Sequence, residues 1–115
     1  MTDYSKLSDF EINKAVAISQ GFAPENCDIA RRGSSLVGVD WDEDTGSATK
    51  VFDYCNNPSD AWPIIAEHEI NILWNWNESR LHGATANPIY EYEHGNPLRA
   101  AMVVYLMMKE SENEN

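Results

Sequence analysis

The chain has 115 residues, 43% of them hydrophobic, and its 19 acidic and 8 basic side chains give a formal net charge of −11. This length and composition predict one folded domain with one core and exclude wholesale disorder. Carboxylates exceed bases in both halves, and Arg31-Arg32 is the only adjacent basic pair. The charge therefore argues against direct binding to nucleic acid or to anionic membranes, which bind clustered Lys and Arg.

The sequence shows no signal peptide and no hydrophobic run of membrane-spanning length, which predicts a soluble cytoplasmic protein. Cys27 and Cys55 lie outside any CxxC motif. In a reducing cytosol we expect two free thiols, and one disulfide is the alternative.

The first predicted element is an amphipathic helix from about Asp9 to Gln20. Ser8 and Glu11 have the spacing of a capping box, and Leu7 with Ile12 have that of a hydrophobic staple. Gly21 follows as a residue suited to end the helix.

A β-hairpin is predicted next, after a connection or short irregular strands over residues 22–35. Strands over 36–41 and 49–54 flank turn-forming residues at 43–47. The acidic spacing from Asp40 superficially resembles a calcium loop, but Thr45 and Val51 occupy the positions that require Gly and Glu. A solvated turn that does not bind calcium is therefore expected.

Residues 56–68 predict a second helix with two possible starts. If Asn57 is the N-cap, Pro58 takes the first helical position, and Pro63 falls in the second turn, where it removes a hydrogen bond. If Asp60 is the N-cap, Pro63 takes the third helical position, where no hydrogen-bonded N–H is lost. We expect a first turn near Pro58 and a regular helix over 61–68.

A second pair of strands is predicted over 70–76 and 89–93, separated by a polar turn region at 80–88. The alternation places four side chains on one face of the first of these strands: Ile70, Ile72, Trp74 and Trp76.

The last helix is predicted to be central to the core. Asn96 is a good N-cap and Pro97 suits the first helical position. Apolar residues cover nearly every face up to Met108, which is typical of a helix with partners on several sides. Leu106→Ala is therefore expected to be costly, and replacement of Arg99 to matter far less.

Together these elements predict an α+β fold, an antiparallel sheet of about four strands with three helices on one face. Residues 1–109 are expected to form a single domain, and the acidic residues 110–115 a disordered tail.

The four tryptophans are many for one domain, and the indole N–H needs a partner when buried. Core filling is the favoured interpretation, but if Trp74 and Trp76 do not both face the last helix, one is exposed as an anchor for a partner. The candidate binding surface comprises Asn56, Asn57, Asp60, Trp62, Trp74 and Trp76.

No catalytic, cofactor-binding or metal-binding residue is predicted. His68, His82 and His94, taken with the two cysteines, match no zinc spacing. The sequence contains no Gly-rich phosphate loop, nucleophile elbow or HExxH motif. The expectation is a protein that is not an enzyme and uses no cofactor.

Two segments, residues 52–65 (FDYCNNPSDAWPII) and 96–102 (NPLRAAM), resemble the NinX family, and residues 3–13 resemble the start of that family. The family comprises small proteins of unknown function from lambdoid phages and prophages. Residues 23–50 and 76–94 are the least similar. The resemblance implies a phage accessory protein in the bacterial cytoplasm and brings no catalytic or binding residues with it.

The function expected from these observations is binding to a host or phage protein. The alternative is a small ligand-binding or enzymatic domain that uses the turn at 53–62 and nearby aromatics, and a concave site with convergent polar groups would favour it. The negative charge also suggests a narrower hypothesis, an acidic decoy that occupies the nucleic-acid site of an enzyme.

Overall fold

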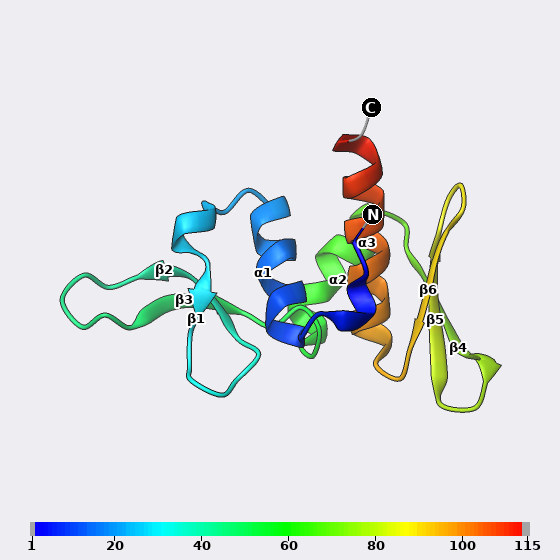
Figure 1. The fold of residues 1–115 in the computed structure, drawn as a ribbon, viewed down its shortest axis with the longest axis horizontal. Coiled ribbons are helices and arrows are strands. Elements are labelled where there is room, and N and C mark those ends of the chain that lie inside the picture. The colour runs from blue at the N-terminus through cyan, green and yellow to red at the C-terminus, as the bar shows by residue number, and fades with distance from the viewer. Residues whose placement is uncertain (1, 114–115) are drawn as a thin grey trace.

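The computed structural model describes residues 2–113, and three helices occupy its middle (Figure 1). The helices are α1 (Asp9–Ser19), α2 (Pro58–Glu67) and α3 (Pro97–Asn113), with short 3₁₀ turns at Tyr4–Lys6 and Pro24–Asn26. The strands are β1 (Asp28–Ile29), β2 (Val37–Trp41), β3 (Ala48–Phe52), β4 (Asn71–Glu78), β5 (Leu81–Ala86) and β6 (Tyr90–His94).

The six strands form two separate antiparallel sheets, ordered β1-β2-β3 and β4-β5-β6. The α+β class is confirmed, but the expected single sheet of about four strands is wrong. One sheet extends from the α1 side and the other packs beside α3, so the helices lie between them (Figure 1). The described chain measures 49 × 35 × 25 Å.

The predicted partner of β4 is also wrong. Residues 81–86, expected to be turn, form strand β5, which pairs with β4 on one side and with β6 on the other. The small residues Gly83, Ala84 and Ala86 of β5 are buried. Their burial explains the error, because a strand of small residues lacks the β-branched and aromatic pattern by which strands are recognised.

The expectation that four side chains of residues 70–76 share one face fails at Asn75. This residue has a φ of 50°, and the register between β4 and β5 is irregular after Leu73. Trp74 contacts His82, on the face of β5 that also carries Ala84. Trp76 instead covers Gly83, on the opposite face. A bulge thus redirects Trp76.

The helix starts follow the sequence closely. Ser8 and Glu11 form both hydrogen bonds of the capping box of α1. Asn57 caps α2, with Pro58 at its first position and Pro63 inside the helix. Asn96 caps α3, because its Oδ1 accepts from the backbone N–H of Leu98 at 3.0 Å.

The predicted central helix lies within the core. Every residue of α3 from Arg99 to Leu106 is buried, against α1, α2 and the inner face of the β4-β5-β6 sheet. The helix continues to Asn113, so residues 110–113 extend it past Lys109. Residues 114–115 of the expected tail lie outside the described residues. Within residues 2–113, no helix is long and apolar enough to cross a membrane.

The burial of α3 predicts a large cost for truncating its core side chains. Leu106 is only 6% exposed, so Leu106→Ala should lower the free energy of unfolding by about 2–5 kcal/mol, measured by urea denaturation. Ile89→Ala is the control, because Ile89 is 84% exposed and its truncation should change stability by less than about 0.5 kcal/mol. An unchanged midpoint for Leu106→Ala would contradict the assignment.

Candidate functional site

The turn that precedes α2 is fixed by its own polar side chains. Asn57 Oδ1 accepts from Ser59 N at 3.0 Å, and Asp60 Oδ2 accepts from Asp53 N at 2.9 Å. Asn56 Nδ2 donates towards Asp53 Oδ1 at 3.1 Å. Three of the six candidate binding residues, Asn56, Asn57 and Asp60, therefore hold the turn in place.

Asn56 also joins this turn to the start of α3. Its Oδ1 accepts from Asn96 Nδ2 at 3.0 Å, and Asn96 Nδ2 donates to the carbonyl of Cys55 at 2.7 Å. One amide of Asn96 therefore caps α3 with its oxygen and fixes the α2 turn with its nitrogen.

Asn13 of α1 is a key residue that the sequence reasoning missed. It is fully buried, its Nδ2 donates to Ser35 O and Asp53 Oδ1, each at 2.8 Å, and its Oδ1 accepts from Cys55 N at 3.0 Å. Helical spacing could have predicted the burial of Asn13, because this residue shares a helix face with Val16 and Ala17.

The contacts of Arg99 contradict the expectation that its replacement would have little effect on stability. Its side chain is 6% exposed, and Nη1 lies 2.7 Å from Asp9 Oδ1. Nη2 donates to the backbone carbonyls of Tyr4 at 3.0 Å and Leu7 at 2.6 Å. A single guanidinium therefore joins α3 to the N-terminal segment. The sequence showed only one charged residue in an apolar helix and did not indicate this role.

This polar network is a structural centre and its groups are largely satisfied by one another. It joins α1, the turn before α2 and the start of α3, the same parts of the chain that carry the family resemblance. Within residues 2–113 no group of three or more His, Cys, Asp or Glu side chains could hold a metal ion.

The candidate tryptophans lie on two different elements. Trp62 on α2 is 63% exposed, and Pro63 and Ala66 beside it are exposed too. Trp74 is 65% exposed and its ring meets that of His82 at 5.0 Å. Trp76 is partly buried over Gly83. Trp62 thus lies on the helix that Asn57 caps, whereas Trp74 and Trp76 lie on opposite faces of a sheet.

Both cysteines are free and buried. Burial raises the pKa of the Cys55 thiol to about 12 and also raises the pKa of Cys27. Each is therefore a protonated thiol near neutral pH, which is unfavourable for a nucleophile because the thiolate is the reactive form.

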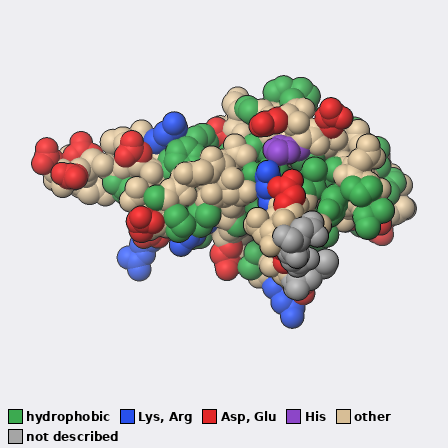
Figure 2. Space-filling view, turned by 90° about the horizontal axis from the view of Figure 1, so that it is seen from above, with side chains coloured by type: hydrophobic (Ala, Val, Ile, Leu, Met, Phe, Trp, Pro, Cys, Tyr) green, Lys and Arg blue, Asp and Glu red, His purple; other side chains and the backbone are tan. Residues whose placement is uncertain are grey.

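Acidic side chains lie in separate groups on the face shown in Figure 2, with Lys and Arg between them. One group marks the far end of the β2–β3 hairpin. In that turn Asp42 Oδ1 accepts from Asp44 N at 2.8 Å and from Thr45 N at 3.2 Å, so Asp42 serves to shape the turn.

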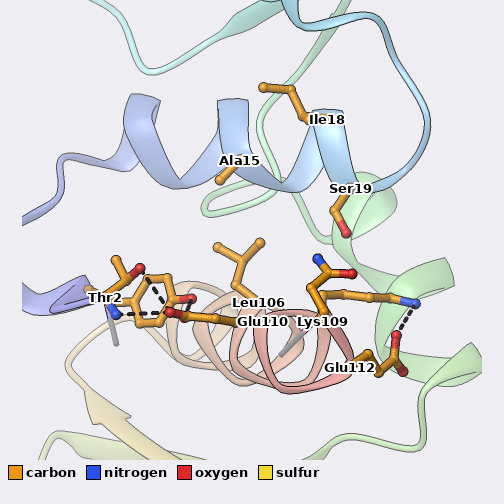
Figure 3. Close-up of a pocket in the computed structure, with 10 residues that line it drawn as sticks. Thr2, Ala15, Ile18, Ser19, Leu106, Lys109, Glu110 and Glu112 are labelled. Atoms are coloured by element: carbon orange, nitrogen blue, oxygen red, sulfur yellow. Dashed lines mark hydrogen bonds and ion pairs between the residues drawn. The ribbon is translucent and has the colours of Figure 1, made fainter. Parts of the chain in front are cut away.

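An open groove of about 750 Å³ lies between α1 and the second half of α3 (Figure 3). Ala15 and Ile18 come from α1, and Leu106 comes from α3. At one end, Glu110 joins α3 to the N-terminal segment, accepting from Thr2 N at 3.0 Å and from Tyr4 Oη at 2.5 Å. The groove lies apart from the 53–62 turn, whose residues do not line it.

The comparisons with known proteins identify one family. A family model described as "Bacteriophage P22, NinX" matches residues 3–109. Neither the curated proteins nor the solved structures give a significant match.

Arg99→Ala should destabilise the protein about as much as a core truncation. Asp9 and the carbonyls of Tyr4 and Leu7 would lose a buried partner, and breaking a buried ion pair costs about 3–5 kcal/mol of unfolding free energy. Arg32→Ala removes the same side chain from an exposed turn and should cost less than about 0.5 kcal/mol. Equal denaturation midpoints for the two variants would refute the role of Arg99.

Glu110 should stabilise the fold in a pH-dependent way. Its pKa is lowered from 4.5, first by the hydrogen bond from Tyr4. A lowered folded-state pKa means that the stabilisation is present above about pH 4.5 and is lost as the pH falls through the folded-state pKa. Glu110→Gln should therefore lower Tm at pH 7, and the difference from wild type should shrink below pH 4.5. A constant difference across that range would contradict this.

Proposed function

Because the chain belongs to this family of bacteriophage proteins, we propose that it is a phage accessory protein that acts by binding another protein in the bacterial host cytoplasm. It uses no cofactor and performs no catalysis. The exposed face of α2 is the contact surface. Its partner is a host or phage protein.

The observation that carries this proposal is the exposure of Trp62 on a rigidly held helix. Trp62 is 63% exposed, and Pro63 and Ala66 extend its apolar surface along the helix. The Asn57 cap and the bond between Asp60 and Asp53 fix the helix start. A pre-positioned aromatic side chain loses little entropy on binding, and tryptophan is enriched among residues that dominate interface energy.

The charge distribution favours general protein binding over the decoy hypothesis. A decoy needs a stripe of carboxylates at phosphate spacing, whereas Figure 2 displays acidic groups separated by basic residues. The net charge of −11 still steers the protein towards basic surfaces and away from nucleic-acid phosphates.

The ligand-binding alternative at the 53–62 turn has less support. Its polar groups, on Asn56, Asn57 and Asp60, bond to other parts of the chain. A ligand would have to displace those bonds, which would loosen the start of α2.

Trp62→Ala should reduce capture of the partner without unfolding the protein. Tagged wild type and variant would be recovered from phage-infected cells and bound proteins quantified by mass spectrometry. Loss of a dominant interface side chain costs at least about 2 kcal/mol, roughly thirtyfold in affinity. Tm should change little, because the side chain is exposed.

Ile89→Ala is the matched control, since Ile89 is 84% exposed in the β5–β6 turn. It should recover the partner as wild type does. Equal recovery of the partner by wild type and by Trp62→Ala would contradict the assignment of the exposed α2 face as the contact surface. Absence of any specific partner in both samples would contradict protein binding itself.

A further inference from the structure

Two histidines lie opposite each other in the β4-β5-β6 sheet. His82 of β5 and His94 of β6 are direct partners in the antiparallel ladder. Strand alternation places both side chains on the face that carries Ala84 and Tyr92 and packs towards α3. Side chains at such opposed positions have Cβ atoms only about 4.5–5.5 Å apart. The two imidazoles are therefore neighbours, and both are half-buried.

Each imidazole accepts a backbone N–H through the same ring nitrogen. Asn75 N donates to His82 Nδ1 at 3.0 Å, and Asn96 N donates to His94 Nδ1 at 2.9 Å. A backbone amide nitrogen can only donate, so both Nδ1 atoms must carry a free lone pair. The two hydrogen bonds therefore require neutral imidazoles, each with its proton on Nε2.

The bond to His82 holds the bulge in β4. Asn75 has a φ of 50°, in the left-handed region, and its Oδ1 accepts from Arg80 N in the β4–β5 turn at 2.7 Å. The ring of His82 also meets that of Trp74 at 5.0 Å. Because the bulge sends Trp76 to the opposite face of the sheet, the bond from Asn75 to His82 helps to fix which face each tryptophan occupies.

The bond to His94 holds the start of α3. Asn96 is the N-cap of that helix, and its Nδ2 donates to the carbonyl of Cys55 and to Asn56 Oδ1. His94 accepts the backbone N–H of the same residue, so the ring orients the side chain that joins α3 to the turn before α2. Two separate parts of the fold, the β4 bulge and the α3 cap, are thus held by one pair of histidines.

A proton on either ring would convert its Nδ1 from an acceptor into a donor. The new N–H would then point at the backbone N–H that it now accepts, and two charged rings would repel each other across the ladder. We propose that His82 and His94 form a proton-operated latch: when neutral they hold the β4 bulge and the α3 cap, and protonation releases both. The latch does not depend on the function proposed for the α2 face.

The surroundings of His94 favour its neutral form. Burial lowers the pKa of His94 from its usual 6.5, the guanidinium of Arg99 on α3 lowers it further, and the carboxylate of Asp9 on α1 acts in the opposite direction. His82 faces the uncharged ring of Trp74 from β4 and His94 from β6. A lowered folded-state pKa means that the stabilisation is present above about pH 6.5 and is lost as the pH falls through the folded-state pKa.

The test is a pH series from about 7.5 to about 5.5 on the intact ¹⁵N-labelled protein, above the range in which carboxylates titrate. Long-range ¹H–¹⁵N spectra of the imidazoles should show the Nε2–H form of His82 and His94 at the upper pH. Hydrogen-exchange protection of the Asn75 and Asn96 amides, corrected for the intrinsic effect of pH on exchange, should fall about tenfold at the lower pH. Protection in the β2–β3 hairpin, which contains no histidine, should stay constant.

A double variant, His82→Asn with His94→Asn, separates the latch from other effects of acid. The Asn side-chain oxygen is an acceptor that takes the place of Nδ1 and does not titrate, so this variant should keep both amides protected at the lower pH. His68→Asn is the control, because the ring of His68 lies against that of Tyr105 at 4.9 Å and belongs to a different contact. It should lose protection of the two amides as wild type does.

Three results would overturn the proposal. They are constant protection of the Asn75 and Asn96 amides in wild type across the series, an Nδ1–H form of either ring at the upper pH, and the same acid-induced loss in the double variant. If the double variant does not fold, the imidazole spectra and amide protection of wild type decide the question. None of these results bears on the α2 surface, which the capture experiment tests separately.

Discussion

The buried guanidinium of Arg99 is the interaction on which the fold depends. It pairs with Asp9 and also donates to two backbone carbonyls of the N-terminal segment. No other side chain could make all of these bonds from position 99. In a low-dielectric interior, such a charge is tolerated only when its partners are in place. Its Nε is buried without a partner among the described residues, so the ion pair and the carbonyl bonds must offset that cost. The position of α1 on α3 follows from this geometry.

The amide side chains of Asn13, Asn56 and Asn96 extend the same centre. Each bonds across to another part of the chain, and together they fix the start of two helices and the turn between β3 and α2. The two sheets lie outside this centre, and each combines buried with exposed positions. Candidate binding surfaces are therefore found on elements whose positions are set by a rigid middle, an arrangement that lowers the entropy lost on binding.

Local signals in the sequence predicted the helices well. The Ser8–Glu11 capping box, the Asn57 and Asn96 caps and the apolar run of α3 depend only on neighbouring residues. The sheets were predicted less well, because β5 is built from small residues and the bulge at Asn75 reverses the face of Trp76. The roles of Arg99 and Asn13 depend on contacts with residues distant in sequence, which spacing alone does not reveal. Asn56, Asn57 and Asp60 were expected to contribute to a binding surface, and that role stays a prediction, whereas their bonds within the chain were not foreseen.

The separation of Arg99 from its partners also affects how the chain folds. Its bonds reach back 90 to 95 residues, so almost the whole chain must form a loop before they close. The β2–β3 hairpin and the β4-β5-β6 meander pair residues that are near in sequence. Local contacts form quickly, whereas contacts over long loops must first overcome the entropy of closure. We therefore expect the hairpins to form early in folding, and the first helix to dock on the last helix in a late step.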